Sequence, residues 1–160
     1  MKNNNVGKFI LGGAIGSMIA EGVVLYLKNK TVKDKSQKVD KFKGYYNMLN
    51  QWLSLKNEGK SLEKYFIDNG YRTIAIYGMG EMGNRLYEEL KNSGITVKYA
   101  IDKEADNTYS ELEVVDMNDD LEEVDAIIIS AVFAFDEIRE ELSAKVDYPV
   151  ISLEDVVYEI

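Results

Sequence analysis

The sequence predicts an α/β fold with a small parallel sheet, preceded by a membrane-spanning helix and a helical connector. In the C-terminal half, short runs of β-branched and apolar residues alternate with segments of helical periodicity, which is typical of a parallel sheet. Near the N-terminus, residues 9–27 form an apolar run of the length that crosses a bilayer. We therefore divide the chain into a membrane anchor with its basic flank (1–35), a helical connector (36–70) and an α/β domain (71–160).

The composition excludes several kinds of site. The chain contains no Cys and no His, which excludes thiol nucleophiles, Ser-His-Asp triads, disulfides and the usual zinc sites. Residues 1–70 carry 12 Lys and 6 acidic residues, whereas residues 71–160 carry 7 basic and 22 acidic residues. The acidic half is a poor binder of nucleic acid, so we expect no nucleic-acid partner.

The apolar run Phe9–Leu27 contains one charged residue, Glu21. Residues 28–43 then carry seven Lys against two Asp, and the positive-inside rule places this flank in the cytoplasm. The sequence thus predicts a single-pass protein of the inner (cytoplasmic) membrane, with its C-terminal domain in the cytoplasm. The alternative is a helix buried against protein or lying on the membrane surface. Glu21 either faces a partner or snorkels to the interface.

Two further patterns favour contacts between helices. Gly12, Gly16 and Ala20 share one face of the apolar run, and small residues so spaced let helices approach closely in lipid. In the connector, five apolar residues recur at spacings of 3 and 4, which makes a heptad seam: Val39, Phe42, Tyr46, Leu49 and Leu53. We expect this seam to pack against a second helix, Ser61–Asp68, as a hairpin that caps the domain. The alternative is a homo-oligomer formed along the seam.

The α/β domain opens with a strand at Thr73–Tyr77, followed at once by Gly78-x-Gly80-x-x-Gly83 and a helix through Leu90. A strand, a glycine turn and a helix in this order are the context in which the motif marks a Rossmann-like nucleotide-binding fold. Gly78 makes the tight turn, Gly80 lets a pyrophosphate approach the backbone, and Gly83 lets helix and strand pack closely. The helix N-terminus then offers N–H groups and a positive dipole end to phosphates.

A second strand, Thr96–Ile101, ends at Asp102. An acid at this place accepts hydrogen bonds from a ribose hydroxyl and repels a 2′-phosphate, which favours NAD over NADP. Lys103, next to Asp102, weakens this preference slightly. Glu81 counts against nucleotide binding of either kind, because it lies where an anionic ligand approaches. The alternative is a glycine turn that only joins strand to helix in an empty domain.

The remaining elements complete the sheet. We expect an edge strand, an acidic helix, a central strand, a helix, a fifth strand and a closing helix at Glu113–Val115, Met117–Val124, Asp125–Ser130, Asp136–Lys145, Val150–Ser152 and Leu153–Ile160, respectively. Right-handed crossovers give the strand order 3-2-1-4-5. The ligand crevice then lies between the first and fourth strands, with residues 78–83 and 130–133 as its walls.

The candidate binding residues lie in the glycine turn and at the two neighbouring strand ends: Gly78, Met79, Gly80, Glu81, Met82, Gly83, Asp102 and Ser130. We predict no catalytic residue. Tyr87 and Lys91 have the spacing of the short-chain dehydrogenase pair but lie on the first helix rather than on the one after the fourth strand. We also predict no metal site, because the acids between residues 116 and 125 match no calcium loop and fit a solvated surface.

Three runs carry a resemblance to a known family: IAIYGMGEMGNRLYEELKNSGITVKYAID, EVVDMNDDLEEVDAIIIS and YPVISLEDVV. Over residues 71–160 the chain resembles the compact Rossmann-like domains of bacterial surface-polysaccharide and nucleotide-sugar proteins, some of which are joined to glycosyltransferases or sugar acyltransferases. The resemblance implies that NAD or a nucleotide-sugar binds at Gly78, Gly80, Gly83 and Asp102. It does not imply catalysis, since such domains often bind or regulate, and we expect an accessory or sensing role beside a polysaccharide-synthesis partner. The alternatives are an NAD-dependent epimerase or reductase completed by a partner chain, and a scaffold that binds no ligand.

Overall fold

The structure is a computed structural model, which describes residues 28, 30, 32–33, 35–36, 38–105, 108 and 110–160. The chain divides into two compact units, Met1–Tyr45 and Tyr46–Ile160. In the first unit, the described residues are helical. Within the described ranges, no helix is long and apolar enough to cross a membrane. The predicted span Phe9–Leu27, with its small-residue face and Glu21, lies outside these ranges.

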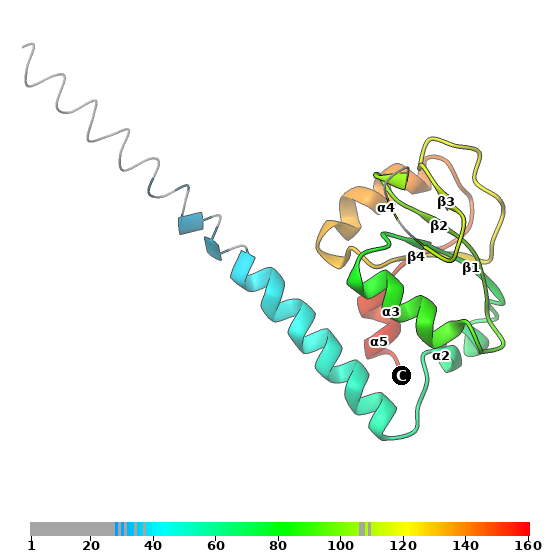
Figure 1. The fold of residues 1–160 in the computed structure, drawn as a ribbon, viewed down its shortest axis with the longest axis horizontal. Coiled ribbons are helices and arrows are strands. Elements are labelled where there is room, and N and C mark those ends of the chain that lie inside the picture. Colours follow the sequence, from blue (N-terminus) through cyan, green and yellow to red (C-terminus); the bar gives the residue numbers. More distant parts are fainter. Residues whose placement is uncertain are drawn as a thin grey trace, which may run out of the picture. The chain divides into compact units, whose positions relative to one another are not determined.

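The second unit is an α/β domain on a five-stranded parallel sheet (Figure 1). Its strands are β1 (Thr73–Tyr77), β2 (Thr96–Ile101), β3 (Val114–Val115), β4 (Ala126–Ile129) and β5 (Val150–Ser152). The order is β3-β2-β1-β4-β5 and each neighbouring pair is parallel. The predicted α/β class and strand order are thereby confirmed. Every residue of β4, and every residue of β1 after Thr73, is buried, as expected for inner strands covered on both faces.

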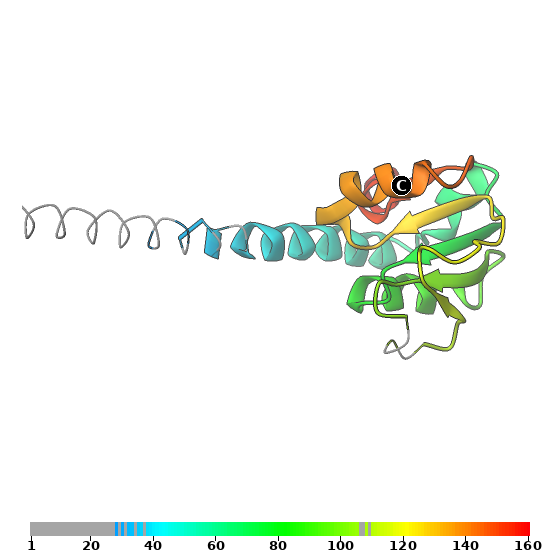
Figure 2. The ribbon, with the colours of Figure 1, turned by 90° about the horizontal axis from the view of Figure 1, so that it is seen from above.

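Helices cover both faces of the sheet. They are α2 (Glu63–Asp68), α3 (Glu81–Leu90), α4 (Phe135–Ser143) and α5 (Leu153–Tyr158), with a 3₁₀ turn, η2 (Val132–Ala134), before α4. Figure 2 shows α3 and α4 on opposite sides of the strands. Accordingly, α3 packs closely on Ile76 of β1, whereas Ile138 of α4 belongs to a buried cluster with Tyr77. The topological switch point therefore lies between the carboxyl ends of β1 and β4.

The predicted acidic helix at Met117–Val124 is wrong, because these residues form a turn followed by irregular backbone. A local hydrogen bond stabilises the turn: the N–H of Asp116 donates to Oδ2 of Asp119 at 2.9 Å. Further along, the hydroxyl of Tyr99 donates to the carbonyl of Glu122 at 2.7 Å. Such side-chain bonds compete with the helical pattern for the same backbone groups.

The connector helix, defined here as residues 46–57, belongs to the second unit. Its buried side chains are Met48, Trp52 and Leu55. The five residues of the predicted seam are instead exposed: Val39 by 64%, Phe42 by 74%, Tyr46 by 68%, Leu49 by 38% and Leu53 by 57%. The predicted packing of this seam against the second helix is therefore wrong. The helix instead buries the face that carries Met48, Trp52 and Leu55, and the indole N–H of Trp52 donates there to the carboxylate of Glu89 at 2.6 Å.

Candidate functional site

The glycine turn after β1 needs glycine at two positions. Gly78 has φ +89°, in the left-handed region that L side chains rarely adopt, and its N–H donates to the carbonyl of Ile101 at 2.8 Å. At Gly83, a Cβ would lie 2.1 Å from the carbonyl oxygen of Gly78 and 3.3 Å from Cγ2 of Ile76. Only a residue without a side chain allows α3 to begin this close to β1.

Internal hydrogen bonds occupy the carbonyl oxygens of this turn. The hydroxyl of Ser130 donates to the carbonyl of Gly78 at 2.6 Å. The side-chain amide of Asn84 donates to the carbonyls of Met79 at 2.8 Å and Gly80 at 3.0 Å. These bonds hold the conformation of the turn from β4 on one side and from α3 on the other.

The N-terminus of α3 is open and uncapped within the described part of the chain. Its N-cap residue is Gly80, whose position provides no side chain to accept a hydrogen bond from the first turn. Apart from Gly80 itself and its two chain neighbours, no described residue has an atom within 4 Å of the position that a Cβ would take there. The backbone N–H groups and the positive end of the helix dipole therefore adjoin open space. Glu81, in the first turn, is exposed and adds a negative charge beside it.

Asp102 lies beside the turn, as the sequence predicts, but its carboxylate already holds the backbone. Oδ2 accepts a hydrogen bond from the N–H of Met79 at 2.9 Å, and Oδ1 accepts one from the N–H of Glu104 at 3.0 Å. A carboxylate oxygen has two lone pairs, so each oxygen retains an acceptor site. Asp102 is partly exposed and can therefore both fix the turn and accept a hydroxyl group.

The structure brings the predicted binding residues together at the switch point, although several of their side chains face inward. Met79 and Met82 are 5% and 8% exposed, and Ser130 is 4% exposed. The N–H of Ser130 also bonds to the carbonyl of Tyr77 at 2.9 Å. Ser130 thus positions the turn from β4. Met82 can offer a ligand only its backbone, and the backbone N–H and carbonyl of Met79 are already bonded to Asp102 and Asn84.

Tyr77, the last residue of β1, carries a buried hydroxyl group. The residue is 3% exposed, and no described residue or other group of the structure hydrogen-bonds to its oxygen. Burial, followed by the negative charges of Glu141, Asp102 and other acids, raises the pKa of Tyr77 to about 12. The hydroxyl therefore remains protonated at neutral pH.

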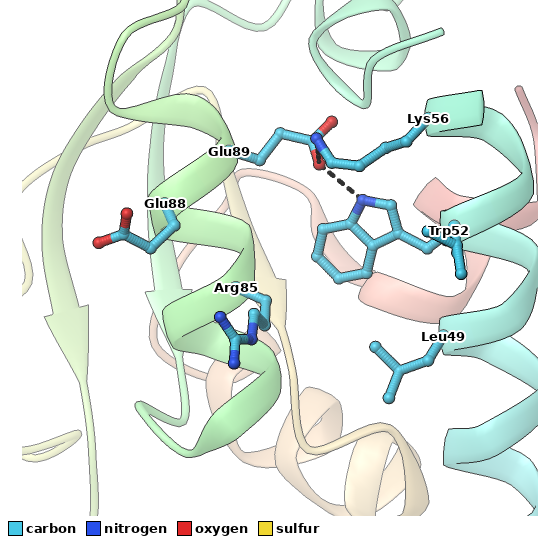
Figure 3. A pocket seen from close by; sticks show the side chains of 7 residues that line it. Leu49, Trp52, Lys56, Arg85, Glu88 and Glu89 are labelled. Atoms are coloured by element: carbon cyan, nitrogen blue, oxygen red, sulfur yellow. Dashed lines mark hydrogen bonds and ion pairs between the residues drawn. The ribbon is translucent and has the colours of Figure 1, made fainter. Parts of the chain in front are cut away.

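A groove of about 330 Å³ lies between the connector helix and α3 (Figure 3). The connector helix and α3 both contribute to its lining: Leu49, Trp52, Leu53, Lys56, Arg85, Glu88 and Glu89. Figure 3 shows the indole of Trp52 lying between Leu49 and the carboxylate of Glu89 along the groove. The groove thus combines an apolar wall with charged groups of both signs.

Glu89 links the two helices that line the groove. Its side chain is 4% exposed and accepts hydrogen bonds from the indole N–H of Trp52 at 2.6 Å and the N–H of Leu62 at 2.9 Å. Lys56 forms an ion pair with it at 3.0 Å. Burial by itself raises the pKa of Glu89, but the bonds from Leu62, Lys56 and Trp52 outweigh it, and the net pKa is lowered. Glu89 is therefore a buried, ionised carboxylate that joins three segments of the domain.

Glu89 is absent from the predicted site residues, although the sequence contains one signal for a buried carboxylate there. Glu89 lies three residues after Leu86 and seven after Met82, on the apolar stripe of α3. A carboxylate on such a stripe requires partners. Its partner Trp52 is 37 residues away in the chain, and no local pattern connects the two.

The comparisons with known proteins add one finding. The family model described as C2185-like, N-terminal, matches residues 70–150. The match begins just before β1 and ends at the start of β5, and it includes the glycine turn, Asp102 and Ser130. Neither a curated protein nor a solved structure matches the chain.

Proposed function

We propose, from the premise that the chain belongs to the C2185-like, N-terminal family, that its α/β domain binds a nucleotide at the glycine turn. The ligand is NAD or a nucleotide-sugar, and its pyrophosphate lies at the N-terminus of α3. The matched region contains the residues that we assign to binding, Gly78 to Gly83 and Asp102.

One observation carries this proposal: the carbonyl oxygens of the turn are already hydrogen-bonded within the domain, whereas the N-terminus of α3 beside them has no side-chain cap. The φ of Gly80, −72°, is accessible to any residue. No described residue other than its two chain neighbours has an atom within 4 Å of the position that a Cβ would take there. That space is where a pyrophosphate approaches in folds of this class.

The charges around the turn select the kind of nucleotide. Asp102 keeps acceptor sites for ribose hydroxyls, and both it and Glu81 repel a further phosphate on the ribose. We therefore expect NAD to bind in preference to NADP. A nucleotide-sugar, which also carries free ribose hydroxyls and a pyrophosphate, satisfies the same groups.

We place this module at the inner (cytoplasmic) face of a bacterial membrane, as an accessory or sensing subunit in cell-envelope polysaccharide synthesis. The apolar run Phe9–Leu27 and the basic flank after it support the anchor. The resemblance to surface-polysaccharide proteins supports the pathway and a glycosyltransferase or related enzyme as partner.

Native mass spectrometry of the full chain, purified in detergent, tests the proposal. We expect a mass increment that corresponds to a nucleotide on the wild type and its loss in Gly80→Val. The Val side chain fills the open space without straining the backbone, so circular dichroism should show an unchanged fold. A nucleotide retained by Gly80→Val would place the binding site elsewhere.

A further inference from the structure

The carboxyl edge of the sheet, where the glycine turn lies, is acidic. We define this edge as the residues between each strand and the first turn of the helix that follows, or the next three residues where no helix follows. These residues include one basic side chain, Lys103, and eight acidic ones: Glu81, Asp102, Glu104, Asp116, Asp136, Glu137, Glu154 and Asp155. The second turns of α3 and α4 add two cations, Arg85 and Arg139, and three anions: Glu88, Glu140 and Glu141. A ligand at this edge therefore meets a negative potential, which favours a positively charged group on the ligand.

Part of this charge acts at the end of β1. Asp102 follows β2, Asp116 follows β3, and Glu137 lies in the first turn of α4. Burial, and then the charges of Glu141 and of these three acids, raise the pKa of Tyr77. Acids from three parts of the fold thus act together at the strand end that the glycine turn follows.

An exposed aromatic ring lies at the same edge. Phe133 is 48% exposed and belongs to η2, which begins two residues after Ser130. Ser130 donates a hydrogen bond to the carbonyl of Gly78 at 2.6 Å, so η2 starts beside the glycine turn. Figure 2 shows that α3 and α4, which η2 precedes, begin at the same edge of the sheet. The face of an aromatic ring attracts cations, and Phe133 therefore suits a positively charged group.

The strand order gives the direction in which a dinucleotide crosses this edge. In the site proposed above, the first ribose lies at Asp102, after β2, and the pyrophosphate lies at the N-terminus of α3, after β1. The next strand in the sheet is β4, so the second half of the ligand continues toward η2. In NAD this half carries the nicotinamide ring, which is positively charged in the oxidised form and neutral in NADH.

We propose that the site selects oxidised NAD over NADH and over UDP-sugars, with the nicotinamide ring against Phe133 and close to Glu137. NADH and UDP-sugars carry the same pyrophosphate but no positively charged ring. They therefore gain neither the contact with the aromatic face nor the attraction to the acidic edge. The domain then senses the oxidation state of NAD. This inference rests on the proposed nucleotide binding at the glycine turn.

Isothermal titration calorimetry of the full chain in detergent, with oxidised NAD, NADH and UDP-glucose as ligands, tests the selection. We expect the dissociation constants of NADH and of UDP-glucose to exceed that of oxidised NAD at least about tenfold at low ionic strength. Because the preference is electrostatic, it should shrink as salt is added.

Substitutions at the edge test which groups make the selection, and the readout is the dissociation constant of NADH divided by that of oxidised NAD. Phe133→Leu removes the aromatic face but keeps an apolar side chain, and Glu137→Gln removes one negative charge. Each should lower the ratio at least about threefold. Tyr158→Leu is the control for the ring, because Tyr158 is 50% exposed and lies at the end of α5. Glu123→Gln is the control for the charge, because Glu123 is exposed and lies just before β4, at the opposite edge. Both controls should leave the ratio unchanged.

The outcomes distinguish the selection from the nucleotide site itself. NADH that binds as tightly as oxidised NAD would overturn the selection but leave a nucleotide site at the glycine turn. A ratio that both Phe133→Leu and Glu137→Gln leave unchanged would do the same. Absence of binding by all three ligands would overturn the selection together with the proposed function.

Discussion

At the scale of single residues, the three glycines of the turn differ in what they contribute. Gly78 is required by its backbone angle and Gly83 by the 2.1 Å approach that a Cβ would make to the Gly78 carbonyl. Gly80 is required by neither. The spacing in sequence predicts all three, but only the structure separates the two that fold the turn from the one that leaves room above it.

Tyr77 gives a prediction at this scale. Its buried hydroxyl has no hydrogen-bond partner among the described residues, and an unsatisfied buried polar group costs roughly 1–3 kcal/mol. Tyr77→Phe removes that group and keeps the ring, so we expect the free energy of unfolding to rise by about 1 kcal/mol. Urea denaturation measures it. A fall in stability would show instead that the hydroxyl is bonded in solution.

At the scale of elements, strands were more predictable than helix faces. The ends of β1, β2 and β5 match the predicted ranges residue for residue, since a buried strand is a local run of apolar residues with distinct boundaries. The inward face of the connector helix carries Met48, Trp52 and Leu55, and Trp52 bonds there to Glu89, 37 positions away in the chain. The helix has two apolar faces, and its periodicity alone does not say which one the domain buries.

Glu89 gives the prediction for this element. Glu89→Gln replaces one acceptor oxygen with a donor among the N–H groups of Trp52 and Lys56, and we expect a loss of about 2 kcal/mol in unfolding free energy at pH 7. Glu88→Gln is the control. The side chain of Glu88 is 52% exposed and pairs with Lys91 at the surface. Glu88→Gln should therefore lower the unfolding free energy by no more than about 0.5 kcal/mol.

The pH dependence of this loss follows from the pKa. Because folding lowers the pKa of Glu89 below 4.5, its ionised form stabilises the fold above that pH, and the contribution disappears as the pH falls through the folded-state value. The difference between wild type and Glu89→Gln should therefore be constant from pH 7 to about pH 5 and shrink at lower pH. Urea denaturation across this range measures it. A constant difference down to about pH 3 would contradict the ionised state that we assign to Glu89.

At the scale of the whole molecule, the charge is divided between the two halves of the chain. Residues 1–70 have a net charge of +6, and residues 71–160 have a net charge of −15. A basic flank next to an apolar run suits the cytoplasmic surface of a membrane. An acidic domain on the same chain is repelled from that surface, so we expect it to face the cytoplasm rather than lie on the lipid.

This arrangement predicts the topology of the chain. A reporter fused after Ile160 should be active in the cytoplasm, and the full chain should require detergent for extraction, because Phe9–Leu27 is apolar and the Lys-rich flank follows it. Reversing the charges of the flank, by Lys→Glu at Lys28, Lys30 and Lys33, is the matched control and should weaken this orientation. A wild-type reporter that is active outside, or a full chain that is soluble without detergent, would contradict the anchor.

The candidate site was predictable in position but not in its internal bonding. Sequence places Gly78 to Gly83, Asp102 and Ser130 at adjacent strand ends, because parallel strands bring their carboxyl ends to one edge of the sheet. Sequence does not show that Asp102 bonds to Met79, or that Ser130 bonds to Gly78. Those partners are 23 and 52 residues apart, and only the packed fold determines which acceptor meets which donor.

The central claim is that a nucleotide binds above Gly80, and isothermal titration calorimetry of the full chain in detergent tests it most directly. NAD, NADH and UDP-sugars are titrated into the wild type, Gly80→Val and, as a control of equal size away from the turn, Ser54→Val. We expect at least one of these ligands to bind the wild type and Ser54→Val alike, and to bind Gly80→Val at least about tenfold more weakly, a difference of about 1.4 kcal/mol. Absence of binding by all of them to the wild type, or equal affinity for Gly80→Val, would contradict the account.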